Sequence, residues 1–260
     1  MEPHVPEPPG SPRLLRPRGV GEILSDAFAL YRRHWQNLIV IVAVIVIPLS
    51  FVQVVLGELW RGQDSDGAFV AGVLASLVIA FTSILMWTVL TGAITRAAAG
   101  TFLGRDLEIG ESYRYGFARF WSIVLIGVLS ALAIAVGFIL LIVPGFIVLT
   151  FLTCAIPVLV IEDRRGREAL RRSWDLVRGF GWPVFGTIVV AGLLSGIVNG
   201  VLTAPFADNW AARSIAASIA SVITMPYMAL VGVFIYLNLR VRKEQYSAAD
   251  LERDLASTAT

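Results

Sequence analysis

One uncharged stretch decides the fold: residues 120–161 read FWSIVLIGVLSALAIAVGFILLIVPGFIVLTFLTCAIPVLVI. A helix needs about 20 apolar residues to cross a bilayer, so this stretch has room for two crossings. It contains no Asp, Glu, Lys or Arg, and its strongest turn signal is Pro144-Gly145, a pair that ends one helix and allows the chain to reverse. We therefore predict two membrane helices here, at about 121–143 and 145–161.

The composition of the whole chain also indicates a membrane protein. Its 260 residues are 57% hydrophobic and 15% charged, whereas soluble domains contain about 25% charged residues. The mean hydropathy is +0.75. Four further long apolar runs, at about 37–60, 67–95, 183–206 and 214–239, raise the number of predicted spans to six. The sequence thus predicts an all-α polytopic membrane protein with six transmembrane helices.

Two tails flank the predicted membrane domain, which covers residues 19–240. Residues 1–18 hold six of the twelve prolines and few apolar side chains, so we expect a disordered Pro-rich cytoplasmic tail. Residues 241–260 follow the last span, and we expect them to form a cytoplasmic C-terminal tail.

The basic residues predict how the chain threads the membrane. With six crossings both termini lie on one side, together with loops 96–120 and 162–182, and only Arg61 and Arg213 of the 21 basic residues remain opposite. Merging the two helices of 120–161 into one crossing would export the arginine-rich 162–182 loop, against the positive-inside rule. All basic residues except Lys243 are arginine, a bias typical of GC-rich bacterial genomes. We expect a multi-pass protein of the bacterial cytoplasmic membrane with both termini cytoplasmic.

A short pattern recurs before the first, third and fifth spans. An acidic residue, at Glu22, Glu111 and Glu168, is followed six positions later by an aromatic residue, with a Trp at the membrane entry. Each copy predicts an amphipathic helix along the cytoplasmic interface. One interpretation is a threefold repeat of an interfacial helix plus two spans. The other is that any helix leading into a membrane acquires this pattern without a repeat.

Small residues and prolines predict packing and bending within the spans. Span five carries a tandem small-xxx-small row, which lets another backbone approach closely: Gly192, Gly196 and Gly200. The partner would be a span of the same chain or, in a homo-oligomer, of a second copy. Kinks are predicted at four prolines: Pro48, Pro144, Pro157 and Pro226.

Six arginines of the 162–182 loop are expected to project around the third interfacial helix toward anionic headgroups: Arg164, Arg165, Arg167, Arg171, Arg172 and Arg178. Four of them are the candidates for contact with a lipid headgroup or with a membrane or cytoplasmic protein partner: Arg164, Arg165, Arg171 and Arg172. Six arginines against four acidic residues leave this loop at +2, and Glu168 with Arg172 is spaced as an i,i+4 ion pair. The alternative is that the arginines only set the topology.

The sequence predicts no catalytic, cofactor or metal site. His4 lies in the tail and His34 at the interface, so neither suits a buried catalytic pair. The single cysteine, Cys154, excludes an internal disulfide and a multi-cysteine metal site. No ionisable residue is expected at membrane depth, which argues against ion-coupled transport. A net charge of +2 lacks the strong basic bias of a nucleic-acid binder, so nucleic acid is not an expected partner.

Several motifs resemble the glycerophosphoryl diester phosphodiesterase membrane-domain family. They are IVPG at 142–145, EALRRSWDLVRG at 168–179, GWPVFG at 181–186 and the opening RPRGVGEILSDAFALYRRHW at 16–35. The resemblance covers most of the chain apart from its ends. It implies a multi-spanning membrane part without the phosphodiesterase domain of some members, so it supplies no catalytic residue.

These observations predict a non-enzymatic membrane scaffold or accessory domain that acts through helix packing and through lipid or partner contacts. The alternative is an uncoupled transporter or lipid-handling carrier. A continuous polar-lined cavity that includes Asn199, Asn238 and the proline kinks would favour the carrier, whereas a tightly packed bundle would favour the scaffold.

Overall fold

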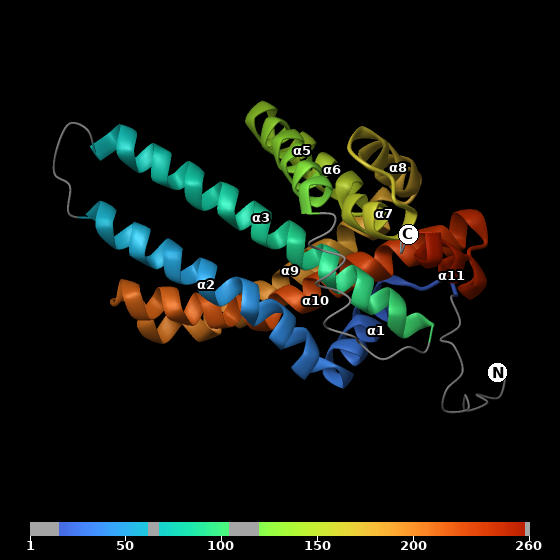
Figure 1. The fold of residues 1–260 in the computed structure, drawn as a ribbon, viewed down its shortest axis with the longest axis horizontal. Coiled ribbons are helices and arrows are strands. Elements are labelled where there is room, and N and C mark those ends of the chain that lie inside the picture. Colours follow the sequence, from blue (N-terminus) through green and yellow to red (C-terminus); the bar gives the residue numbers. More distant parts are fainter. Residues whose placement is uncertain (1–15, 62–67, 104–119, 258–260) are drawn as a thin grey trace.

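The computed structural model describes residues 16–61, 68–103 and 120–257, and its regular elements in these ranges are all helical (Figure 1). The helices are α1 (Val20–Arg33), α2 (Trp35–Arg61), α3 (Ala68–Phe102), α5 (Phe120–Leu140), α6 (Ile142–Leu152), α7 (Ala155–Glu162), α8 (Arg167–Val177), α9 (Gly181–Thr203), the short 3-10 helix η1 (Ala204–Phe206), α10 (Trp210–Glu244) and α11 (Ala248–Ser257). The prediction of an all-α protein is confirmed for this part of the chain.

Four helical segments are long and apolar enough to cross a bilayer: Trp121–Leu140, Ile142–Glu162, Gly181–Phe206 and Ala211–Glu244. A fifth is added if α1 and the first half of α2, which meet at 84°, form one bent span. Large apolar side chains such as Ile139, Leu193 and Val201 are exposed along these segments. Exposure of such an extended apolar surface to water is unfavourable, so these segments are expected to lie in lipid. The chain is a membrane protein.

The stretch 120–161 folds back on itself, but not where the sequence predicted. α5 ends at Leu140, and the extended Leu141 (φ −165°, ψ 154°) separates it from α6. Pro144 lies in the first turn of α6, where its missing N–H needs no helical partner, so it begins a helix instead of kinking one. Gly145 permits close packing: a Cβ at this position would lie 2.4 Å from the Phe138 ring of α5.

α6 and α7 are two parts of one candidate span, broken at Thr153 and Cys154. The break falls at the predicted Pro157 kink, because proline cannot donate a hydrogen bond to the carbonyl four residues earlier. The side chain of Ser173 in α8 forms hydrogen bonds with two backbone groups at this break. Its hydroxyl donates to the carbonyl of Phe151 at 2.7 Å and accepts from the N–H of Cys154 at 3.1 Å.

α10 is the central helix. It packs against α1, α2, α3 and α9, and near its C-terminal end against α7 and α8. The C-terminal half of α10 supplies the fully buried Tyr236 and Phe234. The ring of Phe234 packs edge-on against the ring of Phe102 from α3, with 5.2 Å between the centroids. Figure 1 shows α1, α8 and α11 gathered at one end of the molecule, opposite the turn between α9 and α10.

Both predicted tails differ from the structure at their inner ends. Most of the 1–18 tail lies outside the described residues, but Arg18 is only 5% exposed, and its backbone N–H donates to Asn238 Oδ1 at 2.7 Å. The predicted C-terminal tail is instead helical: α10 continues to Glu244, and α11 packs with Leu251 and Leu255 buried. The folded part of the chain therefore extends further at both ends than predicted.

Two of the three predicted interfacial helices lie within the described residues, as α1 and α8; the pattern of the third, from Glu111 to Phe117, lies outside them. α1 buries Ile23 and Ala27, as its apolar spacing predicts. For α8 the apolar spacing predicts one face made of Ala169, Leu170, Trp174 and Val177. Ala169 and Val177 are buried, but Trp174 is 40% exposed and Ser173 is buried in its place. Ser173 is buried because its hydroxyl forms hydrogen bonds with the backbone groups of Phe151 and Cys154 at the break between α6 and α7.

Candidate functional site

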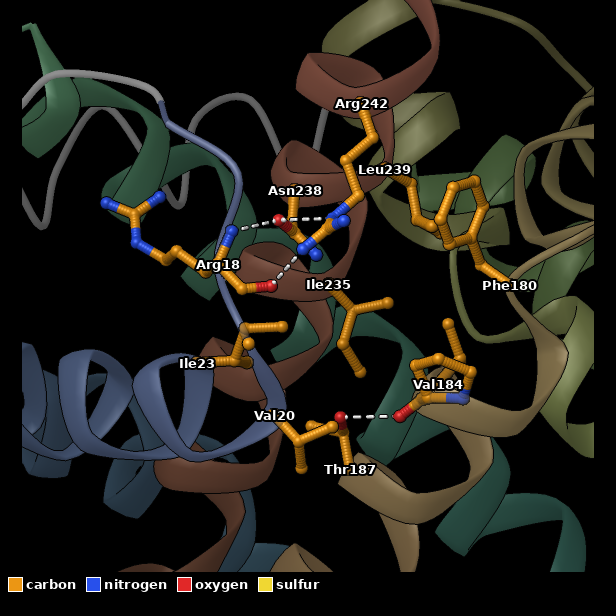
Figure 2. Close-up of a pocket in the computed structure, with 12 residues that line it drawn as sticks. Arg18, Val20, Ile23, Phe180, Val184, Thr187, Ile235, Asn238, Leu239 and Arg242 are labelled. Atoms are coloured by element: carbon orange, nitrogen blue, oxygen red, sulfur yellow. Dashed lines mark hydrogen bonds between the residues drawn. The ribbon is translucent and has the colours of Figure 1, made fainter.

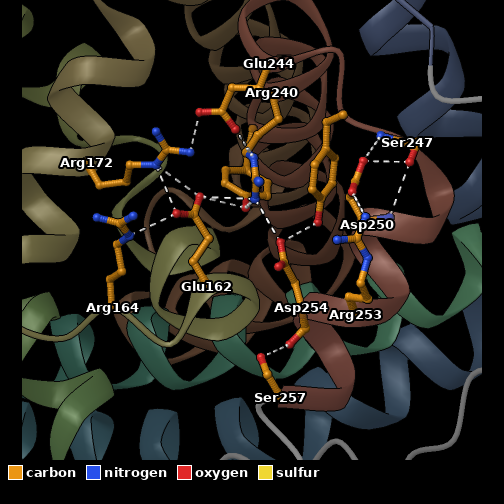
Figure 3. Close-up of polar contacts among 12 residues, drawn as sticks. Glu162, Arg164, Arg172, Arg240, Glu244, Ser247, Asp250, Arg253, Asp254 and Ser257 are labelled. Atoms are coloured by element: carbon orange, nitrogen blue, oxygen red, sulfur yellow. Dashed lines mark hydrogen bonds and ion pairs between the residues drawn. The ribbon is translucent and has the colours of Figure 1, made fainter.

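Glu162, the last residue of α7, is the centre of a dense polar cluster (Figure 3). Its side chain is 8% exposed, and its carboxylate accepts hydrogen bonds from Arg172 Nε at 2.9 Å and from the Tyr236 hydroxyl at 3.0 Å. Arg240 Nη1 and Arg164 Nε lie 3.3 Å and 3.2 Å from its two oxygens. A buried carboxylate needs such partners, since its desolvation is otherwise strongly unfavourable. The cluster thereby joins α7, α8 and α10.

A second carboxylate closes the cluster at the end of α10. Glu244 forms ion pairs with Arg240 Nε at 2.6 Å and with Arg172 Nη2 at 2.5 Å. Both arginines therefore bridge two carboxylates, Glu162 and Glu244. An array of alternating charges of this kind holds each side chain in one orientation, which favours a rigid structure over a mobile binding site.

The cluster continues into α11. Arg240 Nη1 lies 3.0 Å from Asp254 Oδ2, and the Tyr246 hydroxyl donates to the same oxygen at 2.8 Å. The Arg240 guanidinium also lies 3.8 Å from the centroid of the Tyr246 ring, a cation–π contact. Burial and the hydrogen bond to Asp254 raise the pKa of Tyr246, so its hydroxyl stays protonated and continues to donate.

α11 begins with a capping box. The Ser247 hydroxyl and N–H donate to Asp250 Oδ2 at 2.6 Å and 2.9 Å, and the Asp250 N–H donates back to the hydroxyl at 3.3 Å. The hydrogen bonds from Ser247 lower the pKa of Asp250. This cap fixes the start of α11 and so the position of Asp254 two turns later.

The structure divides the arginines of the 162–182 loop into two groups. Three are held by carboxylates of their own neighbourhood: Arg164 and Arg172 by Glu162, and Arg165 by Asp163 at 3.3 Å. The predicted ion pair of Glu168 with Arg172 is wrong, because Arg172 reaches Glu162 and Glu244 instead. Three of the four predicted contact residues are thus already engaged within the chain.

The other group comprises Arg167, Arg171 and Arg178, which are exposed. Within the described residues the structure gives none of these three side chains an ion pair. Of the four predicted contact residues only Arg171 belongs to this group. Arg167 and Arg178 are the other two of the six loop arginines that the sequence directs toward anionic headgroups. All three exposed arginines fall on one face in a helical projection of 167–178.

A cavity of about 270 Å³ lies between the start of α1, the start of α9 and the end of α10 (Figure 2). Two hydrogen bonds cross its polar edge: Asn238 Oδ1 accepts from the Arg18 N–H, and Arg242 Nη2 donates to the Arg18 carbonyl at 2.8 Å. The remaining wall is mainly apolar, with residues such as Ile23 and Ile235. Asn238 therefore fastens the start of the folded chain to α10, and Asn199 does not line this cavity.

A larger and mainly apolar groove, of about 790 Å³, runs between α6 and the start of α9. Its walls are Val143, Phe146, Ile147, Thr150 and Phe151 of α6, and Gly179, Gly181, Trp182, Pro183 and Phe185 in and just before α9. The Thr150 hydroxyl is bonded to the carbonyl of Phe146 at 2.7 Å. Trp182, 84% exposed, stands at one edge.

The glycine row on α9 faces open space. A Cβ built on Gly192, Gly196 or Gly200 would meet no atom within 4 Å, so no other part of the described chain packs closely against the row. Close packing occurs at another glycine: a Cβ on Gly127 of α5 would lie 2.2 Å from Thr88 Oγ1 of α3.

The remaining predicted kinks, at Pro48 and Pro226, lie inside α2 and α10, and both helices continue past them.

Within residues 16–61, 68–103 and 120–257, no group of three His, Cys, Asp or Glu side chains could hold a metal ion. Cys154 is fully buried beside Ser173.

These features define an all-helical membrane protein with an ion-paired polar cluster at one end of the molecule. A family model described as "Domain of unknown function (DUF7847)" matches residues 111–240, which is half of the 260 residues. The chain belongs to this family. The matched region includes α5 to α9 and α10 as far as Arg240, and therefore Glu162, Arg172 and Arg240 of the cluster, the groove and the exposed face of α8. No curated protein and no solved structure matches the chain.

Proposed function

We propose that this protein is a membrane-embedded scaffold or accessory protein without a catalytic site, which acts through contacts with lipids and with a protein partner. The observation that carries the proposal is the Glu162 cluster, which ties α7, α8, α10 and α11 together with ion pairs between largely buried side chains. Such a network costs desolvation and is expected where a fixed geometry matters. A rigid end suits a docking platform when it presents a basic face that has no ion pair among the described residues.

We further propose six crossings with α1, α8 and α11 in the cytoplasm of a bacterial cell. This arrangement adds α2 and α3 as two spans to the four apolar segments. It is supported by the grouping of α1, α8 and α11 at one end (Figure 1) and by the arginines of that end. Reporter fusions test it: fusions at residue 260 and after residue 180 should report a cytoplasmic location, and a fusion after residue 207 the opposite side. A cytoplasmic signal after residue 207 would contradict the threading.

The threefold repeat remains part of the proposal. α1 precedes the pair α2 and α3, and α8 precedes the pair α9 and α10, in the same order. The first helix of the middle copy falls outside the described residues. The resemblance to the glycerophosphoryl diester phosphodiesterase membrane-domain family also stays a prediction, because the matching family carries no described activity.

Reconstitution distinguishes the scaffold from a carrier. The purified chain is placed in vesicles of phosphatidylcholine and phosphatidylglycerol that contain a fluorescent lipid, and the transfer of that lipid between leaflets is followed with a membrane-impermeant quencher. A scaffold predicts the same slow transfer as protein-free vesicles. Transfer that increases in proportion to the protein would contradict the scaffold.

One observation favours the second candidate, an uncoupled carrier of lipids or hydrophobic solutes. The groove between α6 and α9 is apolar and, at about 790 Å³, within the usual size range of ligand sites. A carrier needs this groove to communicate with both leaflets. Crowding the groove with Ile147→Trp should then abolish the protein-dependent lipid transfer, whereas a scaffold has no such transfer to lose.

A further inference from the structure

The exposed face of α8 combines positive charge with an aromatic ring. Arg167, Arg171 and Trp174 are spaced four and three residues apart, so they lie on one face of the helix, and Arg178 follows at its C-terminal end. All four side chains are exposed. Glu168 and Asp175 project roughly a quarter turn to one side of this row. An arginine-rich face with a tryptophan is typical of a helix that meets the headgroup region of a membrane.

This face is continuous with the groove. The Trp174 ring packs on that of Phe151, with 4.2 Å between centroids, and Phe151 lines the groove. A Cβ on Gly181 would also touch the Phe151 ring, at 3.5 Å. Arg178 directly precedes Gly179, another lining residue, where a positive φ of 91° turns the chain from α8 toward α9. A basic surface thus adjoins one end of an apolar groove.

We propose that this combined surface binds one anionic glycerophospholipid, with an acyl chain in the groove between α6 and α9 and the phosphate at Arg171 and Arg178. Charge complementarity identifies the occupant, because these arginines have no ion pair within the described chain, whereas Arg164, Arg165 and Arg172 do. The groove matches an acyl chain because its walls are apolar and its exposed tryptophan stands at an edge. The site rests on the proposed membrane setting of α6 and α9 and names the lipid that a scaffold would hold.

Lipid retention by the purified full chain tests the proposal. The delipidated protein in mild detergent receives equal amounts of phosphatidylglycerol and phosphatidylcholine, and native mass spectrometry measures the bound fraction of each. The wild type should retain one phosphatidylglycerol in preference. The double variant Arg171→Gln/Arg178→Gln should retain phosphatidylglycerol roughly thirty-fold less, as expected for two surface arginines near a headgroup, with phosphatidylcholine unchanged.

Two further variants separate charge from shape. Arg32→Gln/Arg33→Gln removes the same charge from exposed positions of α1 and should leave the preference intact. Ile147→Trp crowds the groove while keeping the arginines, and it should reduce the retention of both lipids. Thermal unfolding in detergent checks that each variant is folded; a variant that fails this check is replaced by Arg171→Lys/Arg178→Lys or Ile147→Phe, for which partial retention is expected.

Three results would overturn the site: equal retention of the two lipids by the wild type, an equal loss in the α1 control, or unchanged retention when the groove is crowded. Rejection of the lipid site can be distinguished from rejection of the proposed scaffold function. Protein-dependent lipid transfer together with arginine-dependent retention would reject the scaffold and keep the site, whereas no transfer and no preference would reject the site alone.

Discussion

α9 and α10 form one hairpin of two candidate spans with nearly equal hydropathy, yet they occupy opposite environments. In the apolar window of α9 only 17% of the residues are buried within the protein, compared with 44% in that of α10. α9 exposes Leu193 and Ile197, whereas α10 buries Phe234 and Tyr236. One helix is the lipid-facing surface, and the other is the centre of the molecule.

Hydropathy therefore selects the spans but not their places in the bundle. An apolar side chain gains little by exchanging lipid for protein, so apolar residues alone place neither helix at the centre. The end of α10 carries Tyr236, Asn238 and Arg240, whose polar atoms find partners only inside the protein. Their requirement for partners explains why α10, and not α9, is central.

The largest expected effect comes from removing the carboxylate of Glu162 at the centre of the polar cluster. Glu162→Ala leaves Arg240 and Arg172 short of a counter-charge, and we expect a loss of about 3–5 kcal/mol in the free energy of unfolding. Denaturant titration in detergent, followed by circular dichroism, measures it. The matched control is Glu168→Ala, an exposed glutamate of α8, which should change stability by less than about 0.5 kcal/mol. Equal effects of the two variants would contradict the special role of Glu162.

Truncations on the two helices test the contrast directly. Phe234→Ala on α10 should cost about 3 kcal/mol, because it leaves a cavity beside Phe102. Leu193→Ala on α9 should cost less than about 0.5 kcal/mol, because the side chain is 62% exposed and lipid replaces the lost volume. The same unfolding measurement applies, and a Leu193 effect as large as that of Phe234 would place α9 inside the protein.

The docking of α11 should weaken at high pH. The raised pKa of Tyr246 means that the folded protein favours its neutral hydroxyl, which faces Asp254, Arg240 and Glu162. The stabilisation is complete below the ordinary tyrosine pKa of about 10 and is lost as the pH rises further, because the unfolded chain then releases its proton first. The midpoint of thermal unfolding should fall above about pH 10. Tyr246→Phe should show a shallower decline, and an identical decline would argue against this linkage.

A smaller effect is expected at the cap of α11. Ser247→Ala removes the hydroxyl that bonds Asp250 and should destabilise the docked helix by about 1 kcal/mol. Hydrogen exchange of the α11 amides should accelerate about five-fold, while exchange in α9 stays unchanged. Ser218→Ala, which removes a hydroxyl bonded only within α10 to the carbonyl of Ser214, serves as the control.

The smallest effect on the fold is expected from Gly196→Leu. The added side chain meets only open space within the described chain, so the stability of the monomer should change by less than about 0.5 kcal/mol. If a second copy packs on the row, the same change should dissociate the oligomer, as size-exclusion chromatography with light scattering would detect. A strongly destabilised monomer would mean that the row packs against this chain after all.

The sequence was informative where one physical rule dominates. Long apolar runs located the helices. The threading that the arginines predict stays a proposal. Rules that depend on local context were less reliable: Pro144-Gly145 looks like a turn, but steric fit against Phe138 makes it the packed start of a helix. α11 was missed because its residues are polar on average, although its Ser247 cap and the spacing of Leu251 and Leu255 are a usable signal.

The candidate site was the least predictable part. Its members, Glu162, Arg172, Arg240 and Asp254, are spread over more than 90 positions, and no local pattern joins them. The sequence suggested Glu168 as the partner of Arg172, because an i,i+4 spacing is the nearest pairing that a helix offers. The fold instead places the buried carboxylate of Glu162 2.9 Å from Arg172 Nε. Arg172 pairs with Glu162 because a buried carboxylate needs a counter-charge more than an exposed one does.

The only cysteine of the chain, Cys154, is sealed at the break between α6 and α7 with 0% of its surface exposed. Thiol reagents applied to intact cells or membranes therefore find no accessible target on the natural protein. A cysteine introduced at any surface position would report alone, so compartment-specific alkylation can map the whole chain without first constructing a cysteine-free background.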